Sequence, residues 1–156
     1  MEINKQIGFS ADGTHRYWLL RSWEDNPKML LVIGLNPSTA DAENDDPTIR
    51  SVIRLAKYNG FGGFIMCNLF TYITSNPTTL RANLGTANDR VSHETLRRMI
   101  ANTSTAVCAW GSWPFIRHRV DTVLELLDEP YCFGRNADGS PKHPLYIKTE
   151  TLISPY

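Results

Sequence analysis

The segment GLNPSTAD, residues 34–41, groups residue types that can bind a ligand or orient water. Gly34 lets the backbone turn sharply or approach a ligand closely. Pro37 holds Asn36 out of helical geometry, so the pair predicts a turn. The hydroxyl of Ser38, together with the amides that follow, could hold an anion. For these residues alone, a tight loop whose Asn and Ser side chains bond their own backbone is an equal alternative.

Two further polar side chains stand later in the chain. Asn68 ends an otherwise apolar run, and its amide offers a donor and an acceptor together, which suits reading the edge of a nucleobase. The alternative is that it caps the end of a strand. His143, between Pro141 and Pro144, could donate to a developing oxyanion, or could have only a structural role. Phe70 could stack on a base, although aromatic residues after a strand are more often part of the core.

An acidic run follows the first loop. It comprises Asp41, Glu43, Asp45 and Asp46, and Asp46 precedes Pro47 as the N-cap of a predicted helix. Most such runs are solvated or cap helices. The alternative is a general base or a Mg²⁺ ligand for phosphate chemistry, with Asp41 the best placed.

Composition and charge narrow the class of protein. The chain of 156 residues has the length of one domain, so we expect a single domain over residues 1–156. A hydrophobic content of 42% allows an ordinary globular core. Lys and Arg number 16, as do Asp and Glu, so the chain lacks the net basic field that drives non-specific DNA binding.

The sequence lacks the motifs that define several classes of enzyme. The sequence has no Gly-rich P-loop, no GxSxG and no GxGxxG, so kinase, α/β-hydrolase and NAD-enzyme hypotheses have no support. Cys67, Cys108 and Cys132 form no CxxC pair, so we expect buried free thiols and no zinc site. No signal segment or bilayer-length apolar run occurs, which predicts a cytoplasmic protein with no membrane partner. The sequence indicates no oligomeric state.

The elements that position the polar residues alternate between strands and helices. A β-hairpin comes first, with a turn at residues 10–13 and an edge strand at 16–21. Strands are predicted at 28–34, 63–70, 105–111, 131–134 and 145–148, and helices from 46–47 to 59, over 87–101 and over 115–127.

This order predicts an α/β fold, a three-layer αβα sandwich with a mostly parallel central sheet of about four strands plus the N-terminal β-hairpin. Ligands bind outside the carboxyl ends of the strands in such sheets. We therefore expect the loop around Asn36, the segment from Asn68 to Phe70, Trp110 and its neighbours, and His143 to meet at one edge.

The motifs GLNPSTAD, DPT, GGF, NLF, AWG and HPLY together resemble an uncharacterised bacterial and phage family of unknown function over nearly the whole chain. The order of GLNPS, NLF, AWG and HPLY is also similar, more distantly, to that of the uracil-DNA glycosylase superfamily. That second resemblance implies the same uracil-DNA glycosylase-like αβα fold.

The glycosylase resemblance implies hydrolysis of an N-glycosidic bond in nucleic acid or nucleotides, without a cofactor or metal. Asn36 would position water, Asn68 would read a pyrimidine edge and His143 would stabilise the departing base. The expected ligand is a nucleobase, nucleotide or nucleic acid. Its further contacts would be Gly34, Leu35, Pro37, Ser38, Phe70 and Trp110. Two alternatives stay open: a non-catalytic module that binds a nucleotide or modified base, and Mg²⁺-dependent phosphate chemistry at the acidic run.

Overall fold

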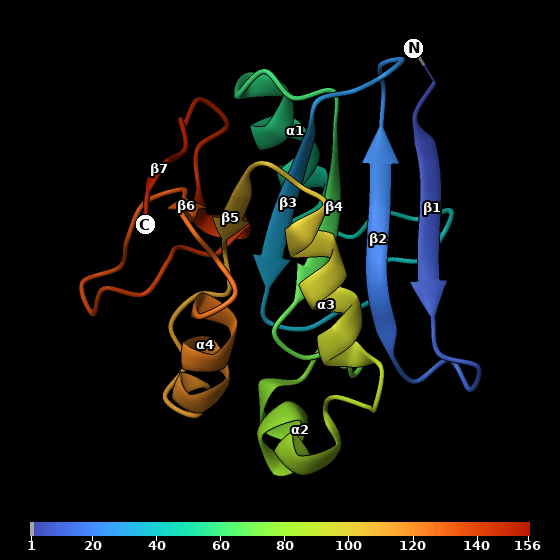
Figure 1. The fold of residues 1–156 in the computed structure, drawn as a ribbon, viewed down its shortest axis with the longest axis vertical. Helices are drawn as coiled ribbons and strands as arrows, with labels where there is room; N and C mark the ends of the chain where they lie inside the picture. The colour runs from blue at the N-terminus through green and yellow to red at the C-terminus, as the bar shows by residue number, and fades with distance from the viewer. Residues whose placement is uncertain (1) are drawn as a thin grey trace.

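The computed structural model describes residues 2–156, which form a sheet of seven strands with helices on both faces (Figure 1). Across the sheet the order is β1-β2-β4-β3-β5-β6-β7. The strands are β1 Asn4–Phe9, β2 Arg16–Ser22, β3 Met29–Gly34, β4 Gly63–Asn68, β5 Ala106–Cys108, β6 Tyr131–Cys132 and β7 Ser154–Pro155. The helices are α1 Pro47–Tyr58, α2 Pro77–Ala82, α3 Ser92–Ala101 and α4 Arg117–Leu124, with short 3₁₀ turns η1 Leu84–Thr86 and η2 Pro144–Tyr146.

The sheet is mixed. β4, β3, β5 and β6 run parallel, whereas β1 with β2, β2 with β4, and β6 with β7 pair antiparallel. The predicted α/β class is therefore confirmed, but the sheet is not mostly parallel as expected, because three of its six strand pairs are antiparallel. The expected sheet of about four strands was too small, because the N-terminal hairpin joins the same sheet through β2 and β4, and β7 extends the opposite side. The predicted edge position of β2 was wrong, since β1 covers it.

Alternation along the central strands gives the sheet two separate cores. In β3, Leu30 and Val32 pack with the buried side of α1. Leu31 and Ile33 belong to the opposite core, with residues of α2, α3 and α4. Figure 1 shows the same division, with α3 in front of the sheet and α1 behind it. The continuous apolar run of β3 thus arises because both of its faces are covered.

Helix α1 begins where the sequence predicts. The side chain of Asp46 accepts a hydrogen bond from the backbone N–H of Ile49 at 2.9 Å, and Pro47 opens the helix. The helix ends at its C-cap, Asn59. This capped start fixes α1 just beyond the loop that contains the candidate site residues.

Two other expectations need correction, and one helix was missed. The helix predicted over 87–101 begins only at Ser92, because the Asp89 carboxylate accepts hydrogen bonds from Val91 and Ser92 and forms a turn. Helix α2, capped by Asn76, was not predicted at all. The strand predicted at 145–148 was wrong. Its first residues form the 3₁₀ turn η2, which the His143 side chain caps.

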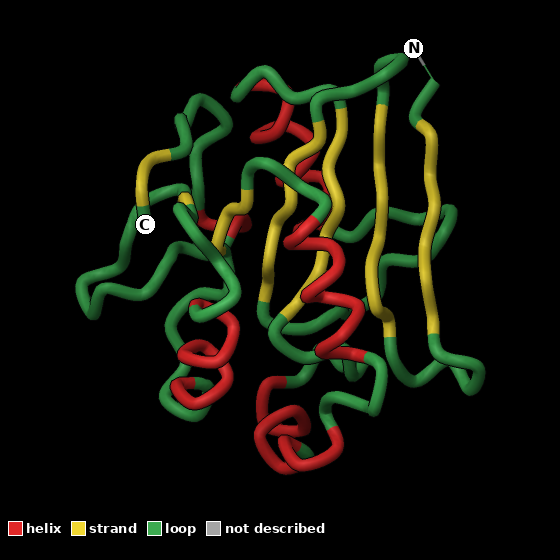
Figure 2. The backbone as a smooth tube through the Cα atoms, viewed as in Figure 1, coloured by secondary structure: helices red, strands yellow, loops and turns green. Residues whose placement is uncertain are grey.

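The carboxyl ends of β3 and β4 lie at the lower edge of the sheet in Figure 1, and loops gather beneath them, green in Figure 2. Hydrogen bonds hold the loops after β3 and β4 together. Leu69 donates its N–H to the Gly34 carbonyl and Phe70 donates to Leu35. These bonds join the two segments into one rim at this edge of the sheet.

Candidate functional site

A pocket of about 640 Å³ opens beside the carboxyl ends of the parallel strands. It brings together seven of the residues singled out in the sequence: Gly34, Leu35, Asn36, Pro37, Ser38, Asn68 and His143. A pocket of this size holds a ligand as large as a nucleotide. Three separate segments of the chain thus meet around one space.

Phe70 and Trp110 lie elsewhere. Both are buried in the core that α2, α3 and α4 cover, and neither lines the pocket. For Trp110 the reason is the two-residue alternation of a strand. Cys108 and Trp110 share one face, whereas Ala109 packs in the other core and Gly111 lines the pocket.

Asn68 is held at the pocket wall with its amide unsatisfied. The residue is only 4% exposed, and its Nδ2 has no hydrogen-bond partner within residues 2–156. Gly34 lies opposite it in the parallel register of β3 and β4. A buried donor without an acceptor costs about 1–3 kcal/mol, so this amide is suited to a ligand that supplies an acceptor.

Asn36 is oriented by three backbone carbonyls. Its Nδ2 lies 3.1 Å from the Pro37 oxygen, 3.1 Å from that of Tyr72 and 2.8 Å from that of Thr74. Carbonyl oxygens only accept hydrogen bonds, so the amide nitrogen must face them and Oδ1 must point away. The side chain thus has a structural role through nitrogen and still offers an oxygen acceptor at the pocket.

His143 has a defined tautomer. Its Nδ1 accepts the backbone N–H of Leu145 at 3.2 Å, as the cap of η2. Burial lowers the pKa of the imidazole below its ordinary value of 6.5, and the charge of Asp46 opposes this only in part. The ring is therefore neutral at pH 7 and carries its proton on Nε2, which makes Nε2 a hydrogen-bond donor.

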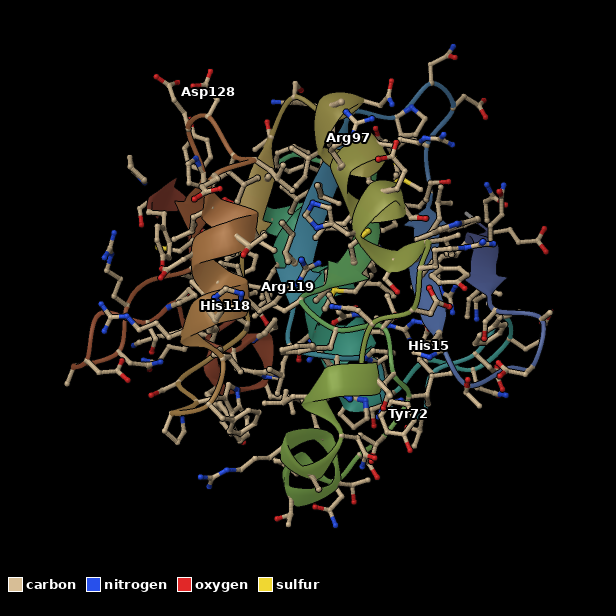
Figure 3. The ribbon with its side chains drawn as sticks, turned by 60° about the horizontal axis from the view of Figure 1, so that its bottom comes forward. His15, Tyr72, Arg97, His118, Arg119 and Asp128 are labelled. Atoms are coloured by element: carbon tan, nitrogen blue, oxygen red, sulfur yellow. The ribbon has the colours of Figure 1, made fainter. Side chains whose placement is uncertain are left out.

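The other labelled histidines are not part of this site. His15 and His118 lie on opposite sides of the ribbon in Figure 3, and neither lines the pocket. His15 bonds Thr71 through Nδ1 at 2.8 Å and meets the ring of Tyr72 edge-on, beside it in Figure 3. These contacts give His15 a structural role between β2 and the loop after β4.

The sequence analysis did not single out Arg16 or Trp113 for the site, and it gave Asp46 only as a member of the acidic run and as a helix N-cap. Arg16 opens β2 and lies at the pocket although it is only 3% exposed. Trp113 supplies an aromatic wall, and its Nε1 donates to the Trp110 carbonyl at 2.7 Å. Asp46 lines the pocket in addition to capping α1. For Trp113 the sequence does contain a signal, since the motif AWGSW places a second tryptophan three residues after Trp110.

The rest of the acidic run shapes the loop. Asp41 accepts hydrogen bonds from the N–H groups of Glu43 and Asn44, which lower the pKa of its carboxyl group. Asp45 pairs with Arg21 at 2.8 Å. Residues 2–156 contain no group of three or more His, Cys, Asp or Glu side chains arranged to hold a metal ion.

The cysteines are free and buried, as predicted. Burial raises the pKa of Cys67 and of Cys108 to about 12, so both remain thiols at neutral pH. They are therefore part of the apolar core. No helix in the described part of the chain is long and apolar enough to span a membrane.

Fold and site together define an α/β protein with a polar pocket at the carboxyl ends of its parallel strands. Two residues of this pocket, Arg16 and Asn68, have buried N–H donors without hydrogen-bond partners in the described chain. Residues 16–145 match the family described as "Protein of unknown function (DUF1643)", and the chain belongs to that family. The resemblance to an uncharacterised family is thus confirmed. No curated protein and no solved structure matches the chain.

Proposed function

We propose that the pocket binds a nucleobase and hydrolyses the N-glycosidic bond that joins it to a sugar. The observation that carries this proposal is the convergence of Asn36, Asn68 and His143 in one pocket. These are the residues for which the resemblance to the uracil-DNA glycosylase superfamily implies water positioning, base recognition and leaving-group stabilisation.

Base recognition is assigned to Asn68. Its buried Nδ2 requires an acceptor, which a carbonyl oxygen on a base edge provides. The neighbouring amide oxygen can accept an N–H from the same edge. Trp113 offers a flat apolar wall for the ring of the base.

Water positioning is assigned to Asn36. With Nδ2 held by three carbonyls, Oδ1 accepts a hydrogen bond from a water molecule and directs the water oxygen at the anomeric carbon. The new bond joins this oxygen to the sugar while the bond from the sugar to the base nitrogen breaks. Because an amide is a weak base, such a site is slow unless a carboxylate helps. Asp46 is the carboxylate that lines this pocket, and it is available to accept the released proton.

Leaving-group stabilisation is assigned to His143. A neutral imidazole with its proton on Nε2 donates a hydrogen bond to an oxygen of the departing base, where negative charge develops. A donor fixed before the reaction needs no reorganisation when the charge appears. The backbone bond to Nδ1 fixes the ring in this way.

The test is release of free base from DNA, RNA and nucleotides that carry uracil, mismatched thymine or modified pyrimidines, with EDTA present. We expect the wild-type protein to release base from at least one of them. Asn68→Asp replaces the amide donor by an acceptor, and His143→Asn keeps a cap for η2 but shortens the donor. Both variants should lose at least about 100-fold in rate. The exposed Asn102, outside the pocket, provides the matched control Asn102→Asp, which should keep the full rate.

Retention of a base analogue without any cleavage would favour the non-catalytic binding module instead. Activity that appears only with Mg²⁺ and disappears with EDTA would favour phosphate chemistry. An unchanged rate in both pocket variants would contradict the assigned roles.

A further inference from the structure

Two buried arginines stand five positions apart on β2, and they differ in their partners. Arg21 is fully buried and all three of its guanidinium nitrogens are bonded. They donate to the Asp45 carboxylate at 2.8 Å, the Leu20 carbonyl at 3.0 Å and the Asp41 carbonyl at 2.8 Å. Arg21 therefore has a complete structural role in holding the acidic loop.

Arg16 is buried to nearly the same degree but lacks such partners. Its Nη1 donates to the Ala40 carbonyl at 3.3 Å, and its Nε is buried without any hydrogen-bond partner in residues 2–156. No ion pair joins it to a carboxylate in the same part of the chain. Burial lowers the pKa of the guanidinium to about 10, which still leaves it charged at neutral pH. The charge of Asp46 opposes this lowering only in part, and no carboxylate of the described residues contacts the guanidinium directly. A buried cation without such a contact is unfavourable unless another group satisfies it.

The unsatisfied group lies at the pocket. Arg16 and Asn68 both line it, and both carry a buried N–H donor that finds no acceptor within the described chain. The backbone places them near each other, since the N–H of Arg16 donates to the Thr71 carbonyl at 2.9 Å, three residues after Asn68. A pocket with two unsatisfied donors is matched by a ligand group that only accepts.

We propose that Arg16, together with the Asn68 N–H that does not bond the base edge, forms a subsite for an anionic, acceptor-only group of the ligand, a carboxylate or a phosphate. This inference rests on the proposed function in taking the ligand to be a nucleobase derivative. A guanidinium binds either group through two parallel charge-assisted hydrogen bonds. The ligand is then a small anion, a nucleotide or a carboxylated base, which agrees with a chain whose basic and acidic residues balance at 16 each.

The experiment measures equilibrium binding by isothermal titration calorimetry at fixed ionic strength. Matched probes separate the two anions: uridine 5′-monophosphate against uridine for a phosphate, and orotate against uracil for a carboxylate. We expect at least one anion to bind the wild-type protein at least about tenfold more tightly than its neutral counterpart. Arg16→Gln should abolish that preference, and Arg16→Lys should keep only part of it.

The control is Arg54→Gln, because Arg54 is exposed on α1 and does not line the pocket. This variant should keep the full preference for the anion. Equal binding of anionic and neutral probes by the wild-type protein, or no binding of any probe, would overturn the proposal whether or not the Arg16 variants fold. A preference that survives Arg16→Gln in a folded protein would do the same.

Base release separates this inference from the proposed function. Cleavage of neutral substrates with no preference for an anion would remove the subsite and leave the glycosidic activity intact. An Arg16-dependent anion preference without base release would keep the subsite and remove the catalytic proposal.

Discussion

Gly34 makes room for the Asn68 side chain. A Cβ at position 34 would lie 2.7 Å from Asn68 Oδ1 and 2.6 Å from the terminal methyl of Met66. The two residues are direct neighbours in the parallel register of β3 and β4. The glycine at the head of the GLNPSTAD motif is therefore required by the amide next to it.

Gly34→Ala should displace the Asn68 amide and reduce ligand binding and base release at least about tenfold, with a loss of about 1–3 kcal/mol in the free energy of unfolding from overpacking. Chemical denaturation and the base-release assay measure the two effects. Gly85→Ala is the matched control, since a Cβ there meets no atom within 4 Å, and it should change neither quantity. Full activity in Gly34→Ala would show that Asn68 does not need its present position.

The two buried arginines of β2 should respond in opposite ways to an apolar replacement. Arg21→Met leaves the Asp45 carboxylate and two carbonyls without their donor and should cost about 3 kcal/mol of unfolding free energy. Arg16→Met removes a buried charge that has few partners, so stability should stay within about 1 kcal/mol of wild type or increase. Urea denaturation of both variants measures the difference. Equal losses would mean that Arg16 is as well satisfied as Arg21.

Asn36→Ala should destabilise the loop as well as the reaction. The amide holds the carbonyls of Pro37, Tyr72 and Thr74, so its removal should lower the free energy of unfolding by about 1–3 kcal/mol. Thermal denaturation checks the loss, and activity must be compared at a temperature at which both proteins are folded. An unchanged melting temperature would show that the three contacts contribute nothing to stability.

The titration of His143 should lower the stability of the protein as the pH falls. Burial lowers its folded-state pKa below 6.5, so the unfolded state binds more protons as the pH falls. Its contribution is fully present above about pH 6.5 and is lost progressively as the pH falls toward the folded-state pKa. His143→Asn keeps a cap acceptor but does not titrate. The melting temperature of the wild type relative to this variant should therefore fall as the pH drops below about 6.5, and a constant difference would contradict a lowered pKa.

Trp113 should report on binding through its fluorescence. Trp113 lines the pocket, whereas Trp110 is fully buried in the core that α2, α3 and α4 cover and does not line the pocket. A base stacked on its ring should quench the emission in a saturable manner. Trp113→Phe should remove most of this signal and keep an aromatic wall for binding. Quenching of the same size in Trp113→Phe would place the ligand elsewhere.

The elements closest to the site were the most predictable. The apolar run of β3, the Asp46-Pro47 start of α1 and the polar residues after β3 and β4 are local signals, and the structure has these elements where the sequence places them. The convergence around His143 follows from a general rule of parallel strands.

What could not be predicted depends on contacts between distant segments. Arg16 looks like any charged residue at the start of a strand. Only the pairing of β2 with β4, 40 or more residues later, brings it to the pocket. The 3₁₀ turn η2 was missed because Pro144-Leu145-Tyr146 has an apolar run typical of a strand. The turn is set by the His143 cap, and a pattern of apolar residues does not show which side chain caps a turn.

The pocket takes residues from nearly the full length of the chain, from Arg16 in β2 to Tyr146 in η2. A ligand that contacts both ends binds only the folded chain and therefore stabilises the folded state against unfolding. At a concentration 100 times its dissociation constant, such a ligand adds about 2.7 kcal/mol to the free energy of unfolding. Because η2 carries few backbone bonds of its own, its amides should gain the most protection from hydrogen exchange when the pocket is filled.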